Sequence, residues 1–152
     1  MKFTNRFRYG LRALSVLAAH YGDRPVSAKT ISEMEELSPS FLEQLLARLR
    51  RGGIVVGVRG PGGGFRLARP PEQIDLEEIV RHLEGPLRVA RCIAEDGTDS
   101  GDCARVDECA AVPLLRRLRE DINTVLGSYT LADIACDVDD GILPARHGKG
   151  RK

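Results

Sequence analysis

Three cysteines, Cys92, Cys103 and Cys109, lie within eighteen residues and flank a loop of small and acidic residues. Such a loop is too polar to bury itself, so it has little reason to be ordered unless something gathers the thiols. Thiolates are soft ligands that suit zinc or an iron–sulfur cluster, and under oxidation two thiols form a disulfide. Ten residues separate the first two cysteines and five the last two, whereas zinc sites favour pairs two residues apart.

On the residues alone, several interpretations of these thiols stay open. The thiols could be incidental buried residues, could pair as a disulfide under oxidation, or could hold zinc. They could also hold an iron–sulfur cluster, whose fourth ligand is unassigned. The sequence contains four cysteines and carries no export signal. This pattern points to metal or redox chemistry before a disulfide framework. Cys136 is expected to be a plain small residue.

The second distinctive segment is a glycine-rich turn. It begins with Arg59 and continues from Gly60 to Gly64. A dinucleotide-binding glycine motif opens a helix, but Phe65-Arg66-Leu67 continues as a strand, which disfavours a phosphate cradle. An ordinary surface hairpin is the competing interpretation. An arginine on a slim hairpin fits the narrow, electronegative minor groove of DNA. Residues 38–69 contain six arginines and one acid, which favours a DNA-contacting wing with Arg59 and Gly60 at the DNA.

A helix is predicted immediately before this hairpin. Ser38 suits the N-cap and Pro39 the first helical position, and the glycine pair after residue 51 suits the end. The leucines that recur at helical spacing are Leu42, Leu45, Leu46 and Leu49. A short β-branched run, residues 54–56, then predicts the first strand of the hairpin.

The early turns of that helix should expose side chains that read bases. Gln44 can bind adenine through two hydrogen bonds, and Glu43 can accept one from the cytosine amino group. We expect Ser40, Glu43, Gln44 and Arg48 to contact DNA from this helix. A shorter helix capped by Ser27 precedes it, and two short helices with a tight connection are typical of a helix-turn-helix.

The first predicted helix, within residues 1–22, is amphipathic and carries Arg6, Arg8 and Arg12. These arginines belong either to a solvated face or to phosphate contacts. Further along, Asp75 caps a helix over residues 76–83. A long helix from Pro113 carries an apolar stripe made of Leu115, Leu118, Ile122 and Val125. A helix appended to a DNA-binding module most often builds a two-fold dimer, and a final short helix is expected at residues 130–134.

These elements predict a mainly α fold with a small β-hairpin. Residues 1–70 form a winged helix-turn-helix DNA-binding domain. Residues 71–137 contain a helix, a cysteine-bearing sensor loop and a dimerisation helix, and residues 138–152 form a disordered basic tail.

The net charge changes sign at the boundary between the first two predicted segments. Residues 1–69 carry twelve basic against five acidic side chains, and residues 70–140 seven against seventeen. Binding of a polyanion should therefore be confined to the first half. No apolar run is long enough to span a bilayer, and a cytoplasmic protein without a membrane partner is expected. No C-x-x-C pair and no nucleophile–base pair is visible, so neither an enzyme nor a small-molecule substrate is expected.

Taken together, the chain resembles the IscR/NsrR-like family of bacterial winged-helix transcription regulators. The residues that carry the resemblance are Phe41-Leu42-Glu43-Gln44-Leu45, Val58 to Leu67, the three cysteines and Thr130-Leu131-Ala132-Asp133. It implies a homodimeric repressor or activator of an operator in double-stranded DNA. Its affinity would depend on an iron–sulfur cluster, of 2Fe–2S or 4Fe–4S type, that responds to redox state, nitric oxide or iron.

The resemblance places cluster ligation on Cys92, Cys103 and Cys109, and DNA contacts on Ser40, Glu43, Gln44 and Arg59. Two positions depart from the family pattern. Val112 stands where some members have a histidine ligand, and Arg8 stands where others donate an acidic ligand from the partner subunit. The fourth ligand is therefore unassigned.

Overall fold

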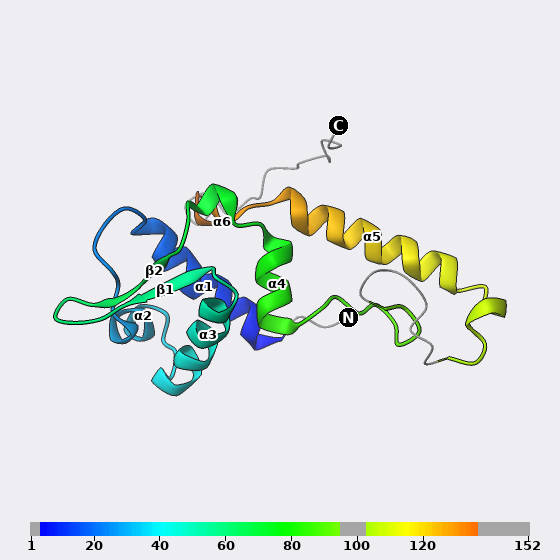
Figure 1. Cartoon of the computed structure of the whole chain (residues 1–152), viewed down its shortest axis with the longest axis horizontal. Helices are drawn as coiled ribbons and strands as arrows, with labels where there is room; N and C mark the ends of the chain where they lie inside the picture. Colours follow the sequence, from blue (N-terminus) through cyan, green and yellow to red (C-terminus); the bar gives the residue numbers. More distant parts are fainter. Residues whose placement is uncertain (1–3, 95–102, 137–152) are drawn as a thin grey trace.

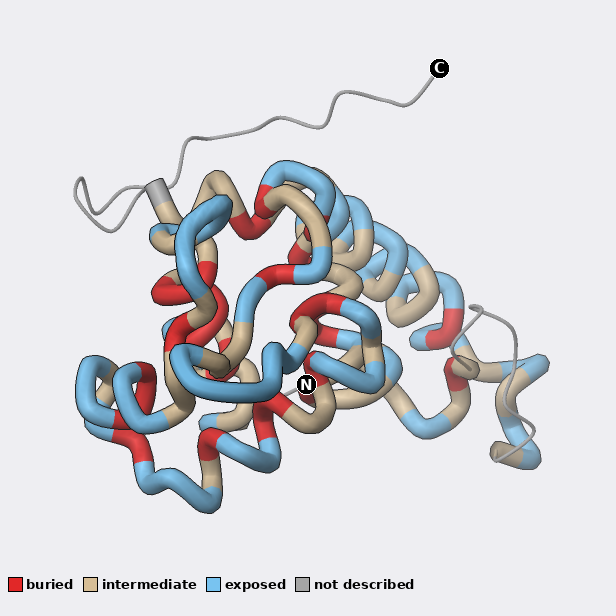
Figure 2. Tube along the Cα trace, turned by 60° about the vertical axis from the view of Figure 1, so that its left-hand side comes forward, coloured by how far each residue is buried: buried red, intermediate tan, exposed pale blue. Residues whose placement is uncertain are grey.

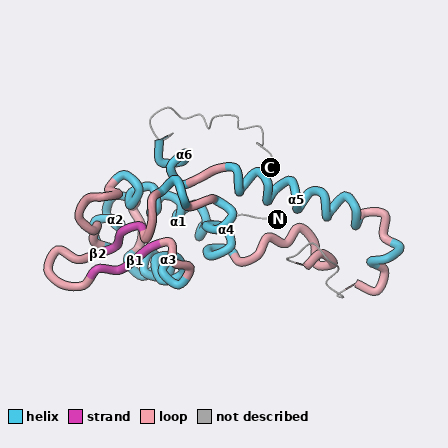
Figure 3. Tube along the Cα trace, turned by 45° about the horizontal axis from the view of Figure 1, so that its top comes forward, coloured by secondary structure: helices cyan, strands magenta, loops and turns pink. Residues whose placement is uncertain are grey.

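The computed structural model describes residues 4–94 and 103–136. Within these ranges the chain forms six α-helices, two short 3-10 turns and one antiparallel β-hairpin (Figures 1 and 3). The helices are α1 (Asn5–Ala19), α2 (Ala28–Met34), α3 (Pro39–Arg51), α4 (Leu76–Glu84), α5 (Val112–Ser128) and α6 (Leu131–Cys136). The strands are β1 (Val55–Val58) and β2 (Gly64–Leu67), and the 3-10 turns are η1 (Pro71–Gln73) and η2 (Val106–Glu108). The predicted fold class is confirmed.

Helix boundaries follow the local capping signals. The Ser27 hydroxyl accepts from the Thr30 amide at 3.0 Å to start α2, and the Ser38 hydroxyl accepts from the Phe41 amide at 3.4 Å to start α3. Between the two helices, Glu36 has a φ of +52°, a left-handed conformation that makes the tight turn. These caps satisfy amides that no helix carbonyl can reach, which explains why the helices begin where the sequence predicts.

The hairpin pairs Val55 with Leu67 and Val58 with Gly64. Its first strand begins at Val55, one residue later than predicted. Ile54 is fully buried, and its amide donates a hydrogen bond to the Leu49 carbonyl at the end of α3, so this amide does not pair with the second strand. Val26 adds an isolated bridge to Phe65, with mutual backbone hydrogen bonds of 2.9 and 2.8 Å. A side chain at Gly64 would lie 2.3 Å from the Val26 carbonyl oxygen, so this approach requires glycine.

One buried core joins the segments on both sides of residue 70. It contains Leu14 and Leu17 of α1 and the four leucines of α3, together with Ile74, Ile79 and Leu83 around α4. Leu131 of α6 is also part of it. The division at residue 70 remains a prediction about function, since in packing α4 and α6 belong to the same core as the helix-turn-helix.

Helix α5 leaves this core and extends away from it, opposite the hairpin (Figures 1 and 3). Its C-terminal end is held by two backbone hydrogen bonds beside α4. The Leu76 amide donates to the Tyr129 carbonyl at 3.0 Å, and the Leu131 amide donates to the Ile74 carbonyl at 2.8 Å. Figure 2 shows that buried residues crowd the core, whereas α5 is mostly exposed or half-buried. Only Val112 of this helix is buried.

Two sequence predictions fall outside the described residues, namely most of the loop between Cys92 and Cys103 and the tail from residue 138. Among the described helices, none combines the length and the apolar character needed to cross a membrane.

Candidate nucleic-acid interface and cysteine segment

Helix α3 is buried on one side and open on the other. Its four leucines are between 0 and 1 % exposed, while Ser40, Glu43 and Gln44 are exposed and Arg48 is half-buried. Polar groups on the first turns of the second helix of a helix-turn-helix are the groups that reach base edges in the major groove. The structure therefore presents the predicted side chains from a rigidly packed helix.

The wing turn presents Arg59 at the tip of the hairpin, and both Arg59 and Gly60 are exposed. Gly60 and Gly62 have φ values of +99° and +74°, and the Gly63 amide donates to the Gly60 carbonyl at 2.9 Å. A side chain at Gly63 would lie 2.3 Å from the Val58 carbonyl oxygen. The glycines thus allow a thin, tightly turned tip, which suits entry into a narrow groove.

Most of the six arginines in residues 38–69 lack carboxylate partners. Among the described residues only Arg69, which follows β2, forms an ion pair, with Glu78 of α4. Arg48, Arg50, Arg51, Arg59 and Arg66 form no ion pair within the described part of the chain. Elsewhere, Arg12, Arg81 and Arg117 pair with Glu35, Glu77 and Asp121. Cations without internal partners remain available to phosphate groups, which dominate the affinity of proteins for DNA.

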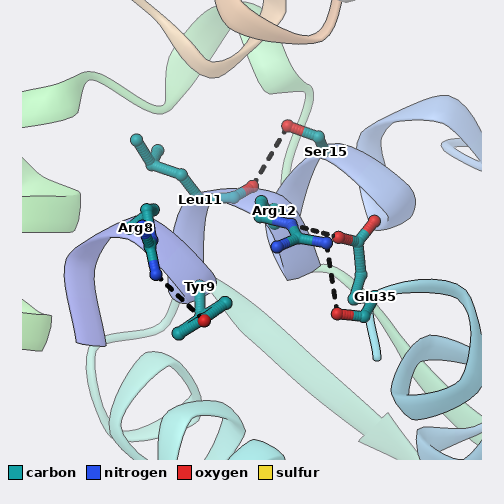
Figure 4. A network of polar contacts seen from close by, with 6 residues as sticks. All are labelled: Arg8, Tyr9, Leu11, Arg12, Ser15 and Glu35. Carbon is teal, nitrogen blue, oxygen red and sulfur yellow. Dashed lines mark hydrogen bonds and ion pairs between the residues drawn. The ribbon is translucent and has the colours of Figure 1, made fainter. Parts of the chain in front are cut away.

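A cluster on α1 that no sequence pattern indicated contacts α3 and the turn before it. Figure 4 shows the contact with the turn, where Arg12 meets Glu35. Tyr9 meets Phe41 of α3 edge to face, with ring centroids 5.9 Å apart. The guanidinium groups of Arg8 and Arg12 lie 4.7 and 5.4 Å from the Tyr9 ring, and the Arg8 Nη2 donates to the Tyr9 hydroxyl at 2.9 Å.

Arg12 completes this bracing. Its Nε pairs with the Glu35 carboxylate at 2.6 Å, and its Nη2 donates to the Glu35 carbonyl at 3.1 Å. Glu35 precedes the left-handed Glu36, so Arg12 holds the turn that sets the angle between α2 and α3. Arg12 is therefore neither a merely solvated group nor one left free for phosphate. No sequence spacing could indicate this pair, since the two residues are 23 positions apart.

The cysteine segment lies at the far end of the molecule from the wing. Cys92, Cys103 and Cys109 are free thiols and half-buried. Consecutive turns connect the last two to α5, because the amides of Val106, Cys109 and Val112 each donate to the carbonyl three residues earlier. Within residues 4–94 and 103–136, no three Cys, His, Asp or Glu side chains lie close enough together to hold a metal ion.

The chemistry of these donors still suits a soft metal or a cluster, because three free thiols stand on the two sides of one short loop. The two positions that depart from the family pattern supply no fourth ligand. Val112 is buried and apolar, and the Arg8 side chain is engaged with Tyr9.

Comparisons with known proteins agree with this arrangement. A model of the Rrf2 family, described as an iron-dependent transcriptional regulator, matches residues 3–137. The regulator IscR of Xenorhabdus nematophila is 37 % identical over 134 residues, covering 88 % of this chain and 79 % of the relative.

Two solved structures are similar over almost their whole length. T. potens IscR is 35 % identical, with a TM-score of 0.69, and the match covers 96 % of this chain and 94 % of that one. CymR, the global cysteine regulator of B. subtilis, is 34 % identical, with a TM-score of 0.69, and the match covers 90 % of this chain and 97 % of that one. These relatives are transcriptional regulators and not enzymes, as the sequence predicts. The chain is therefore a DNA-binding transcriptional regulator with a winged helix, and it belongs to the Rrf2 family.

Proposed function

We propose that this regulator is a homodimer whose affinity for an operator is set by an iron–sulfur cluster on Cys92, Cys103 and Cys109. The observation that carries the proposal is the joining of two features in one chain. A face of unpaired arginines stands at one end, and three free thiols stand at the other, on a segment continuous with α5.

At the DNA, α3 would lie in the major groove with Ser40, Glu43 and Gln44 toward the base edges. The wing would place Arg59 and Gly60 at the adjacent minor groove, and Arg48 would bind phosphate. Helix α1 supports this arrangement from behind, because Tyr9 packs on Phe41 while Arg12 holds the preceding turn.

At the sensor, the three thiolates would hold the cluster and hydrogen bonds of the chain would orient them. A bound cluster supplies a redox-active centre that responds to oxidation, nitric oxide or loss of iron. Cys109 lies two residues before the N-cap of α5, so fixing this thiol also fixes the start of that helix.

At the dimer interface, α5 would pack against α5 of a second copy. In the predicted stripe, Leu118 and Val125 are 45 and 56 % exposed, and Leu115 and Ile122 are half-buried. Leu114, which is 69 % exposed, lies on the same side of the helix. Exposed rows of this kind mark protein–protein contacts. Two-fold pairing would set two α3 helices in successive grooves, about 34–36 Å apart.

The test is an absorption spectrum of anaerobically purified protein combined with operator binding. We expect visible absorption of a thiolate-bound cluster, and operator affinity that changes when the cluster is removed. Single replacement of Cys92, Cys103 or Cys109 by Ala should abolish the absorption and give the affinity of the cluster-free protein. The control, Cys136→Ala, should change neither. A Cys103→Ala protein that kept both the spectrum and the affinity would refute the assignment.

A second candidate keeps the regulator but replaces the cluster. The thiols would then sense oxidants directly or bind zinc. One observation favours this candidate, since the similar CymR is named a global cysteine regulator. Colourless protein with stoichiometric zinc, or with thiols that oxidise reversibly and alter operator binding, would support this candidate over the cluster.

A further inference from the structure

The carboxylate that lies at the N-terminus of α1 belongs to another helix, α4. Thr4 is its N-cap, and the Thr4 hydroxyl accepts from the Arg6 amide at 3.1 Å. The first turn of α1 contains no acidic residue. The Glu84 carboxylate of α4 fills this role, since its Oε1 accepts from the Thr4 amide at 3.2 Å, the Phe7 amide at 3.1 Å and the Thr4 hydroxyl at 2.5 Å.

This arrangement matters because the first amides of a helix have no partner in the helix and carry the positive end of its dipole. A carboxylate that accepts several of them makes charge-assisted hydrogen bonds, which are stronger than neutral ones. One side chain from a position 80 residues away therefore fixes where α1 begins.

The two helices touch closely beside this contact. A side-chain carbon at Gly10 of α1 would lie 2.3 Å from Leu83 Cδ1, so α1 and α4 meet through a glycine. Glu84 is the last residue of α4, and Gly85, with a φ of +89°, ends the helix. The chain then reaches Cys92 eight residues beyond Glu84.

The position of Glu84 makes it sensitive to the cysteine segment. The last turn of a helix is the part that frays most readily, so its order depends on how the following residues are held. Ile93, next to Cys92, is 1 % exposed and anchors that segment by burial. The end of α4 and the segment that carries Cys92 are therefore joined by a short stretch of chain.

At its other face, α1 contacts the DNA-reading elements. Tyr9 packs on Phe41 of α3. Arg12 holds Glu35 in the turn before α3 (Figure 4). Glu84 therefore contacts the N-terminus of the helix that supports the recognition helix.

We propose that Glu84 is a positioning residue that transmits the state of the cysteine segment to α3 through α1. The assignment rests on the proposed function, because it requires that the cysteine segment changes operator affinity. Under this proposal, the effect of the cysteine segment on operator affinity depends on the Glu84 carboxylate, which belongs neither to the DNA-contacting residues nor to the three cysteines.

The first measurement uses the cluster-free full-length protein and follows hydrogen exchange of the Phe7 amide. Glu84→Ala should speed this exchange by roughly tenfold, because the amide loses a charge-assisted acceptor. Glu84→Gln keeps an acceptor without the charge and should give a smaller increase. The matched control is Glu77→Ala, which removes another α4 carboxylate that pairs with Arg81 on the surface. Exchange at Phe7 that is the same in Glu84→Ala and wild type would overturn the proposal.

The second measurement is the ratio of operator affinities with and without the cluster. In Glu84→Ala and Glu84→Gln the visible spectrum should be unchanged, while the ratio moves about three- to tenfold toward one. In Glu77→Ala the ratio should stay at the wild-type value. A wild-type ratio in both Glu84 variants, with an intact spectrum, would overturn this assignment alone. A wild-type protein without cluster-dependent affinity would overturn the proposed function, and the assignment with it.

Discussion

The winged-helix core and helix α5 bury their apolar side chains to very different extents. In the core, the leucines of α3 are almost completely inaccessible. Along α5, Leu114, Leu118 and Val125 are largely exposed, and only Val112 is buried. The core is thus held by contacts within one chain, whereas these three side chains of α5 remain open for the second copy proposed above.

The largest effect should come from a charge placed on the apolar row of α5. Leu118→Asp would bury an unpaired carboxylate between two copies, at a cost of about 3–5 kcal/mol, and should dissociate the dimer. Light scattering at micromolar concentration should then give the mass of one chain. Thr124→Asp is the matched control, because Thr124 is an exposed position of α5 outside this row. If Leu118→Asp still had the mass of two chains, α5 would not form the interface.

A cavity in the core should instead weaken folding and leave pairing intact. Leu46 is fully buried in α3, so Leu46→Ala should lower the free energy of unfolding by about 2–5 kcal/mol. Denaturant unfolding measures this loss. The folded fraction should retain the mass of a dimer. A loss of less than about 1 kcal/mol would mean that the core relaxes around the missing methyl groups.

A smaller effect is expected at the wing, whose arginines have no ion-pair partner among the described residues. Arg59→Ala should weaken specific operator binding by about 1–3 kcal/mol, because it removes a cation from a narrow, electronegative groove. Binding isotherms on operator and scrambled duplex would give the specificity ratio. If that ratio does not change, Arg59 is an ordinary surface residue.

The smallest effect should come from a paired arginine of the other half. Arg81 forms an exposed pair with Glu77 one helical turn away. Surface pairs of this type contribute about 0–1 kcal/mol, so Arg81→Ala should leave both stability and operator binding almost unchanged. Thermal unfolding and the same isotherms test this. A loss in operator affinity equal to that of Arg59→Ala would place the DNA on α4 as well as on the wing.

Elements whose signals are local could be predicted from the amino-acid sequence alone. Ser27, Ser38 and Asp75 each cap a helix where expected, because a cap bonds an amide only a few residues away. The leucine spacing of α3 defined its buried face, and from this its exposed face, with Ser40, Glu43 and Gln44, followed. The glycines after Arg59 defined the turn of the wing, since a left-handed backbone favours glycine.

Contacts between residues distant in sequence could not be predicted in this way and are seen only in the folded chain. Val26 joins the hairpin at Phe65, Arg12 holds the turn at Glu35, and Glu84 caps α1 at Thr4 and Phe7. No periodicity or spacing in the amino-acid sequence indicates that the residues of these pairs meet. Each exists because the shared leucine core brings the two segments of the pair within hydrogen-bonding distance. Local chemistry therefore specified where helices and turns begin and end, and the packing of the core specified which of them act on one another.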